Sequence, residues 1–432
     1  MNERNIIVGL DVGTTKVCTI VGIQHANNQL EIIGIGTHPS YGLKKGSVVN
    51  IDKTVSSIQS SLEEARLMAG VNINSATIGI AGSHIYSFNS SGVVAIKGKE
   101  ITQSDVDRVL EAAKAVVIPS DREILHVIPQ EFRVDNTSGI KNPIGMCGVR
   151  LEAHVHIVTG SIPLIQNLVK CVEHTGLNAE HITLQPIASS EAVLTAEEKE
   201  LGVVLVDIGG GTTDIAIWKE GSLIHSQIIP VGGNHFTNDL AVALKIPHAE
   251  AERIKIHHGS VLAEQLNQSA HITVQGLSGT KPREVQLSLV ADVLGARAEE
   301  LFDIITSIIE EKKLGNDVSG GVVLTGGGAL IKGMPELGEY ILGRGCKIGY
   351  PIPFGGMTNL MQNPKYSTVL GLLIEAAKRS PYVAPVATTK QNFATGSARA
   401  NYSESENEES SNNTDIISKL SDSLKSVFKE IF

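Results

Sequence analysis

The sequence is poor in cysteine, lacks long apolar runs and carries no excess of positive charge. Its four cysteines are scattered, with no C-x-x-C pair, so we expect reduced thiols of a cytosolic protein, neither disulfides nor a zinc site. Residues 1–4 lead directly into a short apolar strand, so we expect no signal peptide, and no apolar run approaches the roughly 18 residues of a spanning helix. The formal net charge of −10 argues against nucleic acid as the main partner.

Three apolar strands each end in a glycine-rich turn, and two of these turns are nearly alike. Residues 6–10 lead into 11–16 (DVGTTK), and residues 203–206 lead into 207–214 (DIGGGTTD). A third strand, 322–324, leads into the run 325–328 (TGGG). Ligands of open α/β sheets bind beyond the carboxyl ends of the strands. The pattern therefore predicts an α/β protein in which two similar halves clamp a polyphosphate.

The residue types of these turns suit a magnesium polyphosphate. Glycine lets backbone N–H groups approach an anion, threonine adds hydroxyl donors, and Lys16 adds a point charge. Asp11 and Asp207 are predicted to hold a hydrated Mg²⁺ between them. A lone turn of this kind is usually a plain β-hairpin, but two copies and a third glycine run favour a binding site. No P-loop motif competes with this interpretation. The predicted phosphate contacts are Gly13, Thr14, Thr15, Lys16, Gly209, Gly210, Gly211, Thr212, Thr213, Gly326, Gly327 and Gly328.

Hydrophobic periodicity gives a coarse order of elements. We expect a three-stranded meander over residues 5–37, a helix over 52–69 and a long helix over about 290–313. Residues 84–160 read as an inserted unit with its own strands and one helix, and its segment 135–148 is predicted to be an exposed loop. His154 and His156 alternate on one strand of this unit, and without a third ligand we expect a solvated strand face rather than a metal site.

The last fifty residues differ from the rest. Residues 381–414 are rich in Pro, Ser, Asn, Glu and Thr and are predicted to be a disordered linker. Residues 415–432 have helical periodicity, which predicts an amphipathic helix that binds a membrane surface or a partner; a helix packed on the body is the alternative. Each apolar side chain contributes roughly 1 kcal/mol, so one copy binds weakly, whereas a filament of many copies binds tightly. The apolar arc comprises Ile416, Ile417, Leu420, Leu424, Val427, Phe428, Ile431 and Phe432.

Several segments together resemble the superfamily of actin, DnaK-type chaperones and sugar kinases, and within it the FtsA family of bacterial cell-division proteins. They are residues 9–16, 81–84 (AGSH), 126–132 (HVIPQEF), 155–160 (VHIVTG), 207–214 and 326–329, with the amphipathic tail. The resemblance covers about 5–380 and the tail. It implies an actin-like, ribonuclease H-like fold of two lobes with an inserted α/β subdomain.

The resemblance also implies a function. It predicts ATP and Mg²⁺ in the cleft, head-to-tail filaments, and peripheral attachment to the cytoplasmic face of the membrane at the division septum. The tubulin-like protein FtsZ would be held through its C-terminal peptide by about 232–300, and later division proteins would bind about 84–160. The implied division of the chain is 1–83, 84–160 (insert), 161–198, 199–231, 232–300 (small subdomain of the second lobe), 301–365, 366–380, 381–414 and 415–432.

The adenosine end follows by the same similarity, and hydrolysis needs a residue that orients water at the γ-phosphate. Glu252 and Lys255 resemble residues that contact ribose and purine, and Gly232 and Gly233 are expected near the phosphates; an ordinary exposed helix face is the alternative for Glu252 and Lys255. For hydrolysis, Asp207 acting through water is the first candidate, and the other candidates are Gln185 and Glu191. We expect at most a weak ATPase.

Two alternatives use the same fold. A small-metabolite kinase would need a substrate pocket with a catalytic carboxylate and has no use for a tethered amphipathic tail. The second alternative, a pilus-assembly or shape-determining actin-like protein, is more closely related to the division protein than a kinase is. The inserted unit at 84–160 and the tail favour the division protein over both.

Overall fold

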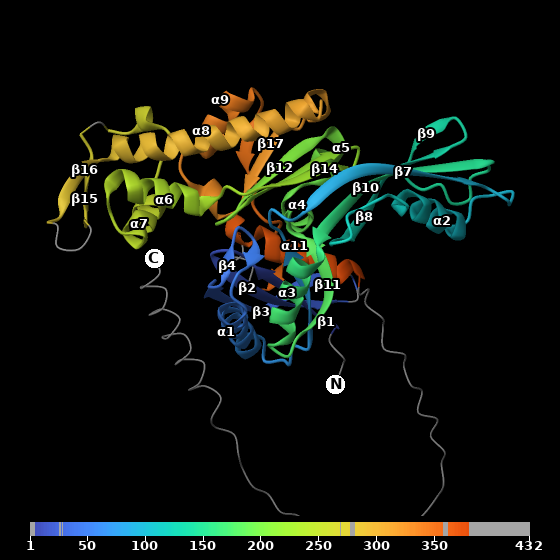
Figure 1. Ribbon diagram of the computed structural model, residues 1–432, viewed down its shortest axis with the longest axis horizontal. Coiled ribbons are helices and arrows are strands. Elements are labelled where there is room, and N and C mark those ends of the chain that lie inside the picture. Colours follow the sequence, from blue (N-terminus) through green and yellow to red (C-terminus); the bar gives the residue numbers. More distant parts are fainter. Residues whose placement is uncertain are drawn as a thin grey trace, which may run out of the picture. The chain divides into compact units, whose positions relative to one another are not determined.

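The computed structural model describes residues 5–25, 27, 29–267, 269–276, 281–356 and 362–379, which lie in one compact unit, Met1–Pro385 (Figure 1). The predicted linker and amphipathic helix, 381–414 and 415–432, lie outside the described residues. All four cysteines are free. Among the described helices, none combines the length and the apolar composition needed to cross a bilayer.

The first lobe is built on a six-stranded sheet of order β11-β6-β1-β2-β3-β19. Strands β1, β2 and β3 form the predicted antiparallel meander, and β6 runs parallel to both β1 and β11. The strands are β1 (Asn5–Val12), β2 (Lys16–Gln24), β3 (Leu30–Pro39), β6 (Ser75–Ile80), β11 (Asn178–Leu184) and β19 (Gly355–Gly356). A small hairpin, β4 (Leu43–Lys44) and β5 (Ser47–Val48), follows β3.

The second lobe repeats this arrangement on a five-stranded sheet of order β14-β13-β12-β17-β18. An antiparallel hairpin, β12–β13, again lies beside a parallel strand, β17. The strands are β12 (Val203–Ile208), β13 (Thr213–Lys219), β14 (Ser222–Ile229), β17 (Val322–Thr325) and β18 (Cys346–Ile348). The two predicted aspartates therefore lie at corresponding places, each near the carboxyl end of the first strand of its hairpin.

Two helices lie between the sheets. They are α4 (Gln185–Val193) and α11 (Ser367–Arg379), and they pack closely, because a Cβ on Gly371 would lie 1.7 Å from the carbonyl oxygen of Ala188. Side chains of β1 alternate between two cores: Ile7 faces α11, whereas Val8 and Leu10 face the outer helices α1 (Ile51–Ala69) and α3 (Ile162–Glu173). Helix α1 is capped by Asn50, whose side chain accepts the N–H of Lys53, and it is followed by Gly70 in the left-handed conformation.

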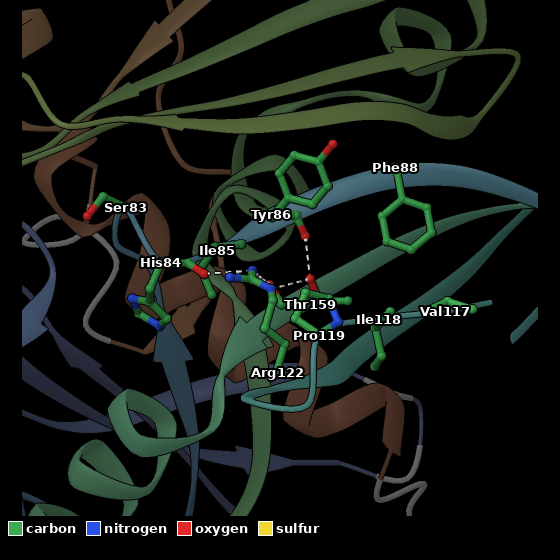
Figure 2. Close-up of a pocket in the computed structure, with 10 residues that line it drawn as sticks. All are labelled: Ser83, His84, Ile85, Tyr86, Phe88, Val117, Ile118, Pro119, Arg122 and Thr159. Carbon is green, nitrogen blue, oxygen red and sulfur yellow. Dashed lines mark hydrogen bonds between the residues drawn. The ribbon is translucent and has the colours of Figure 1, made fainter. Parts of the chain in front are cut away.

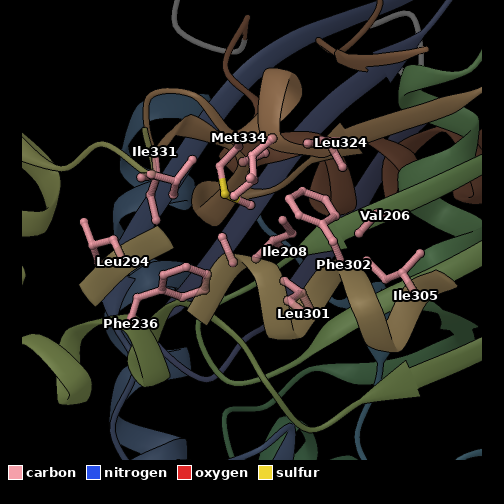
Figure 3. Close-up of a cluster of buried hydrophobic side chains, with 14 of the residues drawn as sticks. Val206, Ile208, Phe236, Leu294, Leu301, Phe302, Ile305, Leu324, Ile331 and Met334 are labelled. Atoms are coloured by element: carbon pink, nitrogen blue, oxygen red, sulfur yellow. The ribbon is translucent and has the colours of Figure 1, made fainter. Parts of the chain in front are cut away.

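The second lobe has its own outer core, shown in Figure 3. Val206 and Ile208 of β12 contact Phe236, Leu301 and Phe302 there. Leu205, one residue from Val206, faces the core that the two lobes share around α11. The helices around the outer core are α6 (Gly233–Leu244), α7 (His248–His258), α8 (Leu287–Glu311) and α9 (Met334–Leu342), with the hairpin β15 (His271–Val274) and β16 (Arg283–Gln286). Helix α5 (Ala196–Leu201) packs on β13 instead.

The inserted unit is a four-stranded sheet of order β7-β10-β8-β9, with helix α2 (Gln103–Lys114) packed on it. Its strands are β7 (Tyr86–Ala95), β8 (Arg122–Val134), β9 (Thr137–Ile140) and β10 (Arg150–Ser161). Strand β9 lies in the segment 135–148 that we predict as a loop. That prediction is wrong for residues 137–140, which pair with β8 although they are too short to show a periodicity.

The unit also contacts β14 of the second lobe, and this corrects one expectation. His156 is fully buried rather than solvated: its Nδ1 lies 2.7 Å from Oδ1 of Asn89 and its Nε2 lies 2.9 Å from Oγ of Ser226. Burial lowers the pKa of His156 to about 3, so the ring is neutral, and Nδ1–H donates to Asn89 while Nε2 accepts from Ser226.

Candidate functional site

The two aspartate-glycine turns have the same local geometry. The N–H of Gly13 donates to the carbonyl of Lys16 at 3.0 Å, and the N–H of Gly209 donates to that of Thr212 at 2.9 Å. Each turn is therefore locally a β-hairpin. The matching bonds show that the sequence repeat is also a structural repeat.

The two turns contact each other. A Cβ on Gly210 would lie 2.3 Å from Cγ2 of Thr15, and one on Gly211 would lie 2.5 Å from Oγ1 of Thr14. Only glycine allows this approach, because any side chain at either position would push the turns apart. The structure thus brings the first and second predicted segments together across the two lobes.

Helix α4 holds both aspartates. The Nε2 of Gln185 donates to Oδ1 of Asp11 at 2.9 Å, and the hydroxyl of Ser189 donates to Oδ2 of Asp207 at 2.5 Å. Gln185 and Ser189 are four residues apart and so lie on one face of the helix. The hydroxyl of Thr368 on α11 donates to the same Oδ2 of Asp207 at 3.0 Å. The carboxylates come from different lobes and share one helix as their support.

Three buried carboxyl groups gather at this place. Burial raises the pKa of Asp11 to about 6, although Lys16 lowers it, and Asp207 raises it further. Burial also raises the pKa of Asp207, against the two hydroxyl hydrogen bonds that lower it. The third carboxyl belongs to Asp214, whose pKa is raised well above the usual range by burial and by Asp207. A bound cation would relieve this charge crowding.

Asp214 is not among the residues predicted above. It lies directly opposite Asp207 in the β12–β13 register, and its Oδ1 is buried with no hydrogen-bond partner among the described residues. The signal that could have found it is its place at the end of the DIGGGTTD run, where antiparallel pairing brings the first and last residues together.

The third glycine run closes the site beside Asp207. A Cβ on Gly326 would lie 2.3 Å from Oδ1 of Asp207, whereas a Cβ on Gly327 would meet no atom within 4 Å. Lys16 approaches from the other lobe: its Nζ donates to the carbonyl of Lys365 at 2.5 Å and lies 4.5 Å from the centre of the Tyr366 ring.

The predicted adenosine-side residues adjoin the second turn. The N–H of Gly233 donates to the carbonyl of Gly209 at 2.8 Å, and Nζ of Lys255 donates to the carbonyl of Gly233 at 3.0 Å. Lys255 also pairs with Glu252 at 2.7 Å.

Glu191, a candidate for hydrolysis, forms ion pairs with Lys199 at 2.8 Å and Lys378 at 2.5 Å. Burial raises the pKa of Glu191, but these two lysines outweigh it and the net shift is downward.

A cavity of about 500 Å³ opens beside the two turns. Thr14 and Gly211 line it, so it lies at the contact between the two lobes. Its other lining residues are Leu43, Lys44, Lys45, Asn234, His235, Asn238 and His248. No sequence motif marks these seven, because they come from a short hairpin and two helices that only folding brings together.

The residues fit a magnesium nucleotide. Thr14 and Gly211 of the two turns line the cavity, Asp214 pairs with Asp207 in the β12–β13 register, and Gly326 packs against Oδ1 of Asp207. Within the described ranges, no group of three or more His, Cys, Asp or Glu side chains is arranged to hold a metal ion directly. Two aspartates that act through water suit Mg²⁺, which keeps its hydration shell.

A second cavity, of about 520 Å³, lies where the insert joins the first lobe (Figure 2). Its wall is mostly apolar, with Tyr86, Phe88 and the fully exposed Val117. The guanidinium of Arg122 donates to the carbonyls of His84 and Thr159 and so holds together the segments that frame the cavity.

Two similar lobes, each with a hairpin turn facing a shared cavity, define an actin-like α/β protein. Solved structures agree on the fold. The PilM–PilN type IV pilus biogenesis complex aligns with a TM-score of 0.63 at 15% identity over 86% of this chain and 98% of that chain. MreB5 of Spiroplasma citri bound to ADP aligns with a TM-score of 0.52 at 17% identity over 87% and 95%.

Sequence comparison identifies the family within this class. The family "SHS2 domain inserted in FTSA" matches residues 82–159, and "Cell division protein FtsA" matches residues 204–371. The chain is 47% identical over 374 residues to cell division protein FtsA of Pseudomonas aeruginosa, covering 87% of this chain and 90% of that protein. It is 38% identical over 378 residues to that of Escherichia coli, covering 86% and 90%. The chain belongs to the FtsA family of cell-division proteins.

Proposed function

We propose that this protein binds ATP with Mg²⁺ between its lobes, polymerises on the cytoplasmic membrane face at the division septum, and anchors FtsZ there. One observation carries the nucleotide site: Asp11 and Asp207, far apart in the sequence, are both held by helix α4, and the turns that follow them line one cavity through Thr14 and Gly211. The family membership supports the role in division. ATP closes the lobes and sets the shape that polymerises, and hydrolysis is slow.

Within the site, the residues divide by charge. Lys16 and the N–H groups of the glycine turns bind the phosphates, and Asp11 and Asp207 hold the hydrated cation. Glu252 and Lys255 contact the nucleoside. Asp207 orients the attacking water, with Gln185 acting mainly as the residue that positions Asp11. Asp214 joins these candidates because its buried Oδ1 has no other partner among the described residues.

Membrane attachment depends on the segment 415–432, which lies outside the described residues. A sedimentation experiment with anionic liposomes, with and without ATP, tests it. Val427→Asp places a charge on the apolar arc, and we expect it to release the protein from liposomes, as does deletion of 415–432. Ser426→Asp adds the same charge on the polar arc and is expected to leave sedimentation close to wild type. Equal sedimentation of both variants with wild type would remove the proposed anchor.

The FtsZ peptide is proposed to bind the small subdomain, about 232–300. Three exposed apolar side chains support this: Val242 on α6, Ile256 on α7 and Leu289 on α8. We expect Ile256→Asp to weaken binding of the FtsZ C-terminal peptide about tenfold, measured by fluorescence anisotropy. Leu201→Asp is the matched control, because Leu201 is as exposed as Ile256 (66% and 65%) but lies on α5. An equal effect of both changes would exclude this assignment.

Later division proteins are proposed to bind the insert, about 84–160. The apolar cavity around Tyr86, Phe88 and Val117 supports this, because exposed apolar concavities are typical of sites where protein segments dock. We propose that residues 84–160 form an inserted subdomain and that residues 232–300 form a small subdomain of the second lobe. Limited proteolysis that cuts first at these boundaries would support that division.

A further inference from the structure

Four consecutive residues, 365–368, contact Lys16 of the first lobe and Thr325 and Asp207 of the second. The carbonyl of Lys365 accepts from Nζ of Lys16, and the Tyr366 ring lies against the same ammonium group. The next residue, Ser367, shares a 2.6 Å hydrogen bond with Thr325, which precedes the third glycine run. Thr368 donates to Asp207. The first residues of α11 and the two residues before it therefore join Lys16 of one lobe to Asp207 of the other.

The contacts of Asp207 are unequal between its two oxygens. Oδ2 accepts hydrogen bonds from Ser189 and Thr368, and Oδ1 faces Gly326, where a side chain is excluded. The two hydroxyl oxygens also lie 3.2 Å apart. Each hydroxyl has only one proton, and the shorter distances of 2.5 Å and 3.0 Å assign both protons to Asp207. In the part of the chain that the structure describes, the carboxylate is thus fixed by Oδ2 alone, and Oδ1 keeps its lone pairs for a ligand.

From this arrangement we infer that Thr368 and Ser189 are positioning residues for the cation. They hold Asp207 by Oδ2 so that Oδ1 is presented to the hydrated Mg²⁺ of the nucleotide. The inference rests on the proposed Mg–ATP binding and adds two residues to it that no motif marks. Because Ser189 and Gln185 share α4, the same helix sets the spacing of Asp207 and Asp11 across the cleft.

The test compares the affinity for ATP in Mg²⁺ with that in EDTA, in the full chain, by isothermal titration calorimetry. Thr368→Val keeps the shape of the side chain but removes the hydroxyl. We expect it to reduce the Mg²⁺-dependent gain in affinity on the order of tenfold, the usual scale for a residue that orients a metal ligand. Affinity in EDTA stays near wild type. Thr368→Ser retains the hydroxyl and restores the gain.

A double-mutant cycle sharpens the result. In the background Asp207→Asn, the change Thr368→Val should have little further effect on the Mg²⁺ gain, because the group that it positions is already altered. Ser189→Ala should reproduce the Thr368→Val effect, and this second variant covers the case in which Thr368→Val does not fold, checked by circular dichroism.

The outcomes separate the two proposals. If the wild type binds ATP with a clear Mg²⁺ gain and neither Thr368→Val nor Ser189→Ala reduces that gain, the positioning role is overturned while the proposed function stands. An equal loss in Mg²⁺ and in EDTA would make the hydroxyls structural only and would also overturn it. If the wild type binds no ATP, the proposed function fails, and the inference fails with it.

Discussion

The two hairpins at the centre of the molecule share a backbone but differ in charge. Lys16 in the first has the same place as Thr212 in the second, because each accepts the turn hydrogen bond from Gly13 or Gly209. Two pairs further from the turn, Cys18 lies opposite Asp11, whereas Asp214 lies opposite Asp207. The first hairpin thus combines one aspartate with a positively charged lysine, and the second combines two aspartates with threonine hydroxyls.

A clamp built from two similar hairpins can therefore have two sides of different charge. The ammonium group of the first hairpin suits the phosphate chain, and the carboxylates of the second suit the cation and its water. Identical hairpins would have placed the same charge on both sides of the ligand.

The first prediction concerns the pH dependence of folding in the first hairpin. Burial raises the pKa of Asp11 from its ordinary value of 3.8 to about 6 in the folded protein. Between these two pH values the folded state binds more protons than the unfolded state. The stabilisation that Asp11 contributes is therefore lost as the pH rises toward 6 and above. Relative to Asp11→Asn, the wild-type free energy of unfolding should fall by about 3 kcal/mol between pH 3 and 7, without nucleotide or Mg²⁺. Urea denaturation measures it, and parallel curves would contradict it.

The second prediction removes the cation side of the clamp. Asp207→Ala should weaken Mg–ATP binding on the order of 100-fold and leave binding in EDTA much less affected, because the lost group contacts the hydrated cation. Glu111→Ala, which removes an exposed carboxylate of the insert paired with Lys114, is the control and should bind as wild type. An equal loss in Mg²⁺ and EDTA would mean that the second hairpin does not serve the cation.

The third prediction removes the phosphate side. Lys16→Gln should weaken ATP binding on the order of tenfold in both Mg²⁺ and EDTA, and more at low salt, because the lost interaction is with the phosphates. Tyr366→Phe keeps the ring against Lys16 and should change the affinity for ATP little. Tyr366→Leu removes the ring and should weaken ATP binding, though less than Lys16→Gln does. A loss restricted to Mg²⁺ would reverse the assigned roles of the two hairpins.

The smallest expected effect concerns the third glycine run. Gly327→Ala meets no protein atom within 4 Å, so folding stability should not change, yet a methyl group beside a bound nucleotide should weaken ATP binding roughly threefold. Gly345→Ala also enters open space in the same lobe and should affect neither quantity. Thermal melting with and without Mg–ATP compares them, and identical nucleotide shifts would remove Gly327 from the site.

Most of the fold could be predicted from local patterns. The meander, the helix over 52–69 and the long helix near 290–313 agree with β1–β3, α1 and α8, because strong periodicities repeat over many residues. The paired strands β4–β5 and β9 have only two to four residues each, too few for any periodicity. His156 shows a different limit: a polar residue on a strand reads as exposed until a neighbouring element, here β14, covers it.

The sequence alone determined which residues carry the chemistry of the turns, since the spacing of Asp, Gly and Thr within each hairpin is a local property of the chain. Only the tertiary structure decided what supports them. Gln185, Ser189 and Thr368 lie in no motif, and their roles arise because α4 and α11 pack between two sheets and reach both aspartates. Hydrogen bonds between residues 161 or more positions apart depend on packing, which no local spacing encodes.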